Sequence, residues 1–316
     1  MTTGECIIDG TDIATLGMFI ERDGSNDLLA FPERRRPDQN DWAEEDGIDV
    51  DMTDIFFDAK KVVINYVMLA DDFPSFQQRI KAFESLHTLP GMRQIYIREY
   101  ATTFILRFVS FKDYRHKGGY YKPSKKRAEF AVEYAMDDPL QLYTTAISSP
   151  VGDPKSNQYV KFNGRDLSGY GIIVKDIYRS ALKPRSVKDV LVRKIHIVSG
   201  QEADTEMLET HRKSREIEID CAMMAANRNE LLINMTALFN EFRKSTPIQL
   251  MIAYESTYCY YMKTSRFSKP FPFSKKVRID FVLHLQEITW AELVRLLATF
   301  GRGRIKTISG YYIKLK

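Results

Sequence analysis

The amino-acid sequence predicts an α+β protein of two tandem modules, each a mainly antiparallel β-sandwich or split barrel with one packed helix. Three observations predict this fold class. The chain has 316 residues, which suits two domains of roughly 150 residues each. Its composition, 44% apolar and 28% charged, is that of a globular protein rather than a disordered or collagen-like one. Finally, the patterns of the first half recur in the same order in the second half.

The recurrence consists of five blocks. The turn at 9–12 returns 154 residues later at 163–166, and the alternating run 62–68 returns 155 residues later at 217–223. Three further pairs follow: 76–83 with 231–238, 94–97 with 249–252, and 128–134 with 277–283. The offset falls to 149 in the last pair, as a shortened hairpin loop would produce. Five blocks in one order favour duplication of one module; two unrelated α+β domains with similar periodicity are the alternative.

Each module is expected to contain a strand, a long polar excursion, an alternating strand, one helix and then further strands. These elements are expected at 18–20, 21–54, 60–69, 73–87, 94–111 and 126–136, and again at 172–174, 179–213, 215–224, 228–243, 249–267 and 275–287. Asp71 or Asp72 is expected to cap the first helix, and Asn227 or Asn229 the second. One helix against about six strands predicts a sandwich or a partly open barrel.

The remaining segments predict the domain boundaries. Residues 138–158 contain three prolines and are expected to be a linker. The first module then covers 1–137 and the second 159–289. Residues 290–316 are expected to form a C-terminal helix, at Trp290–Phe300, and a last strand.

Charge is distributed unequally between the two halves. The net charge is +4, but residues 1–150 carry 18 Lys and Arg against 25 Asp and Glu, and residues 151–316 carry 28 against 17. A basic half is compatible with nucleic-acid binding, whereas opposite halves can also attract each other or neighbouring subunits. The second interpretation is favoured because acids such as Asp176, Asp189 and Glu202 interrupt the basic half.

Patterns typical of catalytic, cofactor or metal sites are absent from the sequence. The three cysteines are too scattered for a disulfide framework, and no two of the five histidines have ligand spacing. No phosphate-binding loop or nucleophile elbow occurs. The carboxylates around Glu44–Asp54 lack the glycine and spacing of a calcium loop, so they are interpreted as a solvated loop. We therefore expect no enzymatic activity, no cofactor and no metal.

Targeting and membrane segments are also absent. No apolar run of about 18 residues occurs, so no membrane span is expected. The first ten residues lack the basic and apolar regions of a signal peptide. Synthesis in a reducing cytoplasm is the expectation.

The order of elements resembles the tail-tube-like module of tailed bacteriophages, and in particular the N-terminal domain of the distal tail protein (Dit) family. The resemblance is carried by the run Asp58–Leu69, the helix at 73–87 and the run Leu89–Ile97, with Asp46-Gly47 upstream. It covers about residues 5–138 and, by the internal repeat, 160–288. Distal tail proteins of the simple kind carry one such domain, whereas two per chain resemble tail hub proteins.

The resemblance implies a non-enzymatic virion protein that forms a ring at the distal end of the tail. The ring would be a hexamer, or a trimer with pseudo-sixfold symmetry, that joins the tail tube to the baseplate or tip. It implies as partners further copies of the chain and the tail tube and baseplate or tip proteins, with DNA at most passing through the lumen. Its location would be the virion tail, after synthesis in the bacterial cytoplasm.

The two excursions are the candidate subunit interface, because closed rings need a head-to-tail contact. The acidic loop of one copy is expected to meet the basic stretch of another. The residues concerned are Glu44, Glu45, Asp46, Asp49 and Asp51 on one side and Lys183, Arg185, Lys188, Arg193 and Lys194 on the other. The alternative function is a nucleic-acid-binding protein that uses the basic second half, over 155–213 and 302–316.

Overall fold

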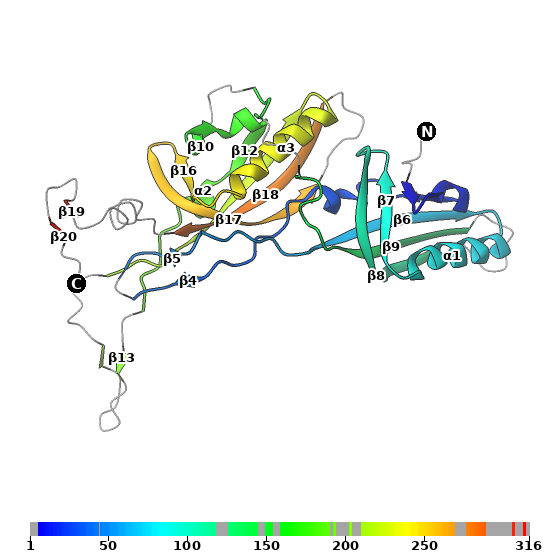
Figure 1. The fold of residues 1–316 in the computed structure, drawn as a ribbon, viewed down its shortest axis with the longest axis horizontal. Coiled ribbons are helices and arrows are strands. Elements are labelled where there is room, and N and C mark those ends of the chain that lie inside the picture. Colours follow the sequence, from blue (N-terminus) through cyan, green and yellow to red (C-terminus); the bar gives the residue numbers. More distant parts are fainter. Residues whose placement is uncertain are drawn as a thin grey trace.

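The computed structural model describes residues 6–43, 45–117, 126–144, 149–153, 159–189, 192–193, 202–203, 210–268, 276–288, 305–306 and 312–313. The fold is predominantly β, with a few helices. Two seven-stranded sheets lie one beside the other along the long axis of the molecule (Figure 1). No helix in these ranges is long and apolar enough to cross a membrane.

The first sheet is antiparallel, with strand order β2-β1-β7-β8-β9-β6-β3. Its strands are β1 (Cys6–Ile8), β2 (Thr11–Asp12), β3 (Met18–Ile20), β6 (Lys60–Ala70), β7 (Met92–Ile97), β8 (Thr102–Lys117) and β9 (Lys126–Met136). Alternation in β6 buries Val62, Ile64 and Tyr66 completely, because successive side chains point to opposite faces. The strand predicted at 126–136 is confirmed with the same bounds.

The first sheet is curled rather than flat. Its two edge strands, β2 and β3, are joined by residues 13–17, which include the 3-10 helix η1 (Ile13–Leu16). A connection this short spans at most roughly 20 Å, whereas a flat seven-stranded sheet would extend over roughly 29 Å. The edges therefore approach each other.

Helix α1 (Phe73–Thr88) packs on the first sheet and confirms the predicted helix. The side chain of Asp72 caps its N-terminus by accepting a backbone hydrogen bond. His87 is buried, with Nδ1 2.8 Å from the carbonyl oxygen of Phe83 and Nε2 2.6 Å from the hydroxyl of Tyr134. Burial lowers the pKa of His87. This histidine thus joins the helix to β9.

The second sheet has the strand order β11-β10-β16-β17-β18-β15-β12, which matches the first sheet strand for strand. Its strands are β10 (Val160–Phe162), β11 (Arg165–Asp166), β12 (Ile172–Asp176), β15 (Glu216–Ala225), β16 (Ile248–Ile252), β17 (Glu255–Ser268) and β18 (Val277–Ile288). The short helix η3 (Leu167–Tyr170) joins its two edges, as η1 does in the first sheet. The same argument from chain reach therefore applies, and this sheet curls as well.

Helix α3 (Arg228–Phe242) packs on the second sheet and is capped by Asn227. It is buried on more sides than α1, which buries only Phe76, Phe83 and His87. The buried residues of α3 are Leu231, Asn234, Met235, Thr236, Ala237, Leu238, Phe239, Asn240 and Phe242. The difference arises because segments of the first half cover α3.

The first part of the predicted linker, residues 138–144, is packed rather than loose. The ring of Tyr143 lies 4.5 Å from that of Phe239, and its hydroxyl donates to the carbonyl of Leu29 at 3.0 Å. The predicted helix Trp290–Phe300 lies outside the described residues. The short strands β19 (Ile305–Lys306) and β20 (Tyr312–Ile313) pair with each other near the C-terminus. The domain boundaries stay a prediction.

Candidate assembly surface

The first polar excursion forms a long hairpin, which we call arm 1 (residues 21–59). Its elements are η2 (Asn26–Leu29), β4 (Gln39–Asn40) and β5 (Asp49–Val50). Backbone hydrogen bonds join its two strands, from Arg35 to Phe56 and from Asp58 to Glu33, each of 2.9 Å. Arm 1 leaves the first sheet and runs beside the second (blue in Figure 1).

Arm 1 inserts an aromatic side chain into the second half. Phe31 is only 3% exposed. Its ring centroid lies 5.5 Å from that of Phe239, 5.7 Å from that of Phe242 and 6.1 Å from that of Phe281. Aromatic pairs at these separations add to the stabilisation from area burial. The two halves of the chain therefore share one core cluster.

Arm 1 also supplies a hydrogen bond that the second sheet lacks at a β-bulge. Met262 is the extra residue of β17, between the paired residues Tyr261 and Lys263. An extra residue of this kind leaves backbone groups without a cross-strand partner. The N–H of Arg34 donates to the Met262 carbonyl at 2.8 Å, and the Tyr261 hydroxyl donates to the carbonyl of Pro32 at 3.0 Å.

The distal part of arm 1 covers a second apolar cluster. The cluster consists of Ile48, Val50, Met52, Tyr260 and Ile288, with Tyr258 and Met262 packed against it. The guanidinium of Arg34 lies 5.2 Å from the centre of the Tyr260 ring, a cation–π contact. Burial lowers the pKa of Arg34. Arm 1 therefore contacts the second half along much of its length.

A lysine holds the base of arm 1. The ammonium of Lys60 donates to the carbonyls of Leu28 at 3.0 Å and Ala30 at 2.5 Å. Burial lowers its pKa from 10.5 to about 7, and the nearby carboxylate of Asp27 opposes this effect. Between these two pKa values the unfolded chain binds more protons than the folded chain. This group therefore makes folding more favourable as the pH rises above 7.

We expect the stability difference between the unaltered chain and Lys60→Met to grow with pH. Linkage predicts a change of about 2 kcal/mol between pH 6.5 and 8.5 in favour of the unaltered chain. Urea unfolding at both pH values measures this difference. Lys61→Met, at the exposed neighbouring residue, is the control and should show no such trend. A pH-independent difference for Lys60→Met would contradict the assignment.

The second excursion forms an equivalent hairpin, which we call arm 2 (residues 177–215). Its elements are α2 (Tyr178–Ala181), β13 (Val192–Arg193) and β14 (Glu202–Ala203). The β13–β14 pairs lie 153 residues beyond the β4–β5 pairs. Val187 pairs with Arg212, as Arg34 pairs with Phe57 in arm 1. The first strands of the two arms are therefore aligned at an offset of 153, whereas the offset of the second strands rises from 153 at Ala203 to 155 at Arg212.

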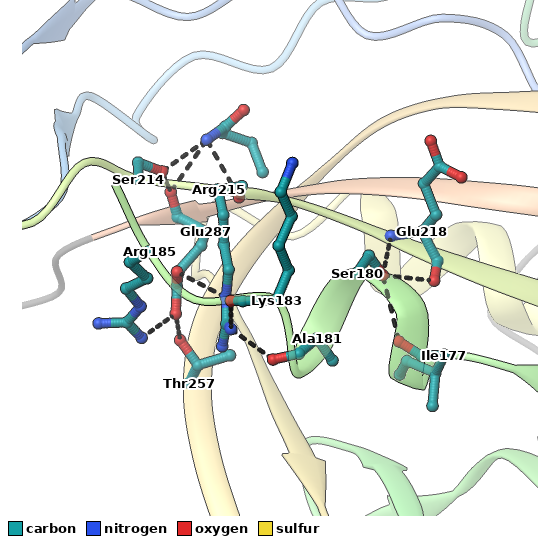
Figure 2. Close-up of polar contacts among 11 residues, drawn as sticks. Ile177, Ser180, Ala181, Lys183, Arg185, Ser214, Arg215, Glu218, Thr257 and Glu287 are labelled. Atoms are coloured by element: carbon teal, nitrogen blue, oxygen red, sulfur yellow. Dashed lines mark hydrogen bonds and ion pairs between the residues drawn. The ribbon is translucent and has the colours of Figure 1, made fainter. Parts of the chain in front are cut away.

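A buried carboxylate holds the base of arm 2 (Figure 2). Glu287 is 5% exposed and accepts from Arg185 at 2.5 Å and from the Thr257 hydroxyl at 2.6 Å. The Arg215 guanidinium lies 3.1 Å from the other Glu287 oxygen and donates to the carbonyls of Ala181 and Lys183. Arg185, a predicted interface residue, is thus bound within its own chain.

The predicted acidic loop meets arm 2 of the same chain. The N–H of Arg212 donates to the Asp46 carboxylate at 2.6 Å. Glu45, Asp46 and Asp49 are exposed, and Asp51 accepts hydrogen bonds from Thr53. Glu44 lies outside the described residues.

The predicted basic stretch meets arm 1. The ammonium of Lys188 lies 2.7 Å from the Asp41 carboxylate and donates to the Trp42 carbonyl at 2.5 Å. Lys183 is exposed. Arg193 lies in β13, and Lys194 lies outside the described residues. The charged stretches thus meet within one chain, and their pairing between copies stays a prediction.

One polar cluster was not predicted from the sequence. Glu216, Glu218 and His284 each offer a ligand atom within 4.8 Å of the others. Nδ1 of His284 lies 2.5 Å from Glu216, and its Nε2 lies 2.6 Å from the hydroxyl of Ser265. Both ring nitrogens therefore have partners within the protein. Only the pairing of β15 with β18 brings these residues together, and no sequence spacing indicates it.

The comparisons with known proteins found likenesses among solved structures. No family model matches the chain, and no curated protein matches it. Among solved structures it is similar to the SPP1 Dit (gp 19.1) protein, described as a paradigm of hub adsorption apparatus in phages that infect Gram-positive bacteria. The match covers 90% of this chain and 99% of that chain, at a TM-score of 0.34 and 9% sequence identity. A likeness of this size carries no argument about function.

Proposed function

We propose that this chain is a non-enzymatic structural protein of a bacteriophage tail. In this proposal, copies assemble into a ring at the distal end of the tail, as a hexamer or as a trimer with pseudo-sixfold symmetry. The ring joins the tail tube to the baseplate or tip. Its two sheets are two copies of one tail-tube-like module.

The contact between arm 1 and the second half carries this proposal. It joins two units of the same strand order through different surfaces, an arm on one and a sheet face on the other. A contact of this head-to-tail kind propagates and closes into a ring when its rotation fits. The resemblance of 58–97 to distal tail proteins supports the location.

The nucleic-acid-binding alternative is less well supported by the contacts. Several cations of the basic half are paired with acids of the chain, namely Lys175, Arg179, Arg185, Lys188, Lys213 and Arg215. Cations that are already paired neutralise fewer phosphates, so fewer counterions are released from the nucleic acid on binding. DNA affinity with a steep dependence on salt would favour the alternative over the ring.

Sedimentation velocity of the purified chain tests the proposal. We expect a concentration-dependent shift from one chain to a species of three or six chains. The same run in about 1 M NaCl tests the charge pairing between arms of different copies, because salt screens exposed charges. A chain that stays monomeric at high concentration and is not recruited by tail tube or baseplate proteins would refute the structural role.

A further inference from the structure

Equivalent positions of the two halves are defined by the matching strand pairing. Asp72 and Asn227 cap α1 and α3 and lie 155 residues apart, so Glu84 is equivalent to Phe239. Phe130 pairs with Tyr66, and Phe281 pairs with Cys221. Because Tyr66 and Cys221 are also 155 apart, Phe130 is equivalent to Phe281. The pairing thus gives an offset of 151 for the last strands and corrects the offset of 149 expected from the sequence, because alternation alone does not fix the register. These equivalences allow the surroundings of Phe31 to be compared with the first half.

The first half has an open pocket where the second half holds Phe31. This pocket, of about 230 Å³, lies between α1 and β8 and is lined mainly by Ile80, Phe83, Glu84, Phe111 and Phe130. Glu84 and Phe130 occupy the positions of Phe239 and Phe281, which contact Phe31 in the second half. The pocket is therefore the first-half counterpart of the site that Phe31 fills.

The β-bulge next to the pocket also has a counterpart. Val109 is the extra residue of β8, between Phe108 and Ser110, as Met262 is in β17. In the second half, Arg34 of arm 1 donates to the Met262 carbonyl. Val109 is 45% exposed, and within the described residues no backbone hydrogen bond from outside the sheet reaches it.

Arm 2 exposes apolar residues at positions whose equivalents in arm 1 are buried. Leu29, Phe31 and Arg34 are 2%, 3% and 4% exposed. Their equivalents, 153 residues later, are Leu182, Pro184 and Val187. All three equivalents are exposed, Leu182 by 63% and Val187 by 50%. In one chain, therefore, arm 1 fills the site on the second sheet, and the equivalent pocket on the first sheet is open. The apolar residues at the base of arm 2 are exposed.

We propose that arm 2 of one chain packs on the first sheet of a second copy. Leu182 and Pro184 cover the pocket between α1 and β8, and the N–H of Val187 donates to the carbonyl of Val109. Lys183 lies between Leu182 and Pro184 and carries a charge opposite to that of Glu84, which lines the pocket. This contact rests on the proposed function and specifies the surface through which the ring forms.

Disulfide cross-linking tests this contact in the full-length chain. The double variant Val109→Cys/Val187→Cys should form a ladder of linked chains under oxidation, and each single variant should not. The native cysteines Cys6, Cys221 and Cys259 are buried and free, so they do not compete. A double variant that sediments as an oligomer without cross-linking between chains would overturn this contact but leave the ring. A monomer would overturn both.

Charge introduced on arm 2 gives an independent readout. Leu182→Asp and Val187→Asp alter exposed side chains, so the fold should be retained, as unfolding curves will verify. We expect each to weaken self-association about tenfold or more. Tyr254→Asp, at the tip of the β16–β17 turn and 98% exposed, is the control and should leave association unchanged. Equal association by all three variants would contradict the proposal.

Discussion

Replacing Phe31 by alanine is expected to lower the free energy of unfolding by about 3 to 5 kcal/mol. The ring is almost completely buried between α3 and β18 and contacts Phe239, Phe242 and Phe281. Its removal leaves a cavity that rigid neighbours fill only in part. Because Phe31 lies in arm 1, the same change should loosen the arm from the second half.

Urea unfolding and limited proteolysis measure these two effects of Phe31→Ala. Proteolysis should become faster at the arginines 34–36 of arm 1. The matched control is Phe56→Ala in the opposite strand of the same arm, because that ring is 57% exposed. We expect the control to change stability by about 0.5 kcal/mol or less. Similar losses for both variants would show that Phe31 does not hold the arm.

Glu287→Gln is expected to have the second-largest effect, a loss of about 2 to 3 kcal/mol. The carboxylate is buried and contacts both Arg185 and Arg215, so its neutralisation leaves two cations without their counterion. This loss is below the roughly 3 to 5 kcal/mol that follows from breaking a fully buried pair, because the Arg185 side chain is 32% exposed and water stabilises it.

Hydrogen exchange of residues 183–189 and 210–215 distinguishes a local from a global effect of Glu287→Gln. Exchange should accelerate there, because Arg185 and Arg215 hold the base of arm 2. Asp189→Asn is the control, because its ion pair with Lys213 lies at the surface, with Asp189 92% exposed. This control should produce no measurable loss of stability. Unchanged exchange in Glu287→Gln would contradict the anchoring role.

Local periodicity predicted most of the elements but not their assembly. The strand at 126–136 and the helix at 73–87 were predicted within one residue at each end, because alternation and helical spacing are strong there. The acidic loop of the first polar excursion was expected to meet the basic stretch of another copy, and in the structure it also meets arm 2 of its own chain. Its apolar residues Ile48, Val50 and Met52, which alternate with aspartates, were the available signal of a half-buried strand.

Contacts between distant segments could not be predicted from one sequence. The stacking of Phe31 on Phe239 and the pairing of Lys188 with Asp41 each depend on how the two halves sit together. The packing of Tyr143, within the predicted linker, on Phe239 depends on the same arrangement. His284 lies beside Glu216 because of the register in which β15 pairs with β18. Single residues do not determine such a register.

The central claim is that the chain closes into a ring through repeated head-to-tail contacts of arms with sheets. Electron microscopy of the purified, assembled chain tests it most directly through the rotational symmetry of the particles. The account predicts closed rings with threefold or sixfold symmetry, in which arms 1 and 2 bridge neighbouring sheets in the same way. Twofold dimers, open filaments or particles of a single chain would contradict it.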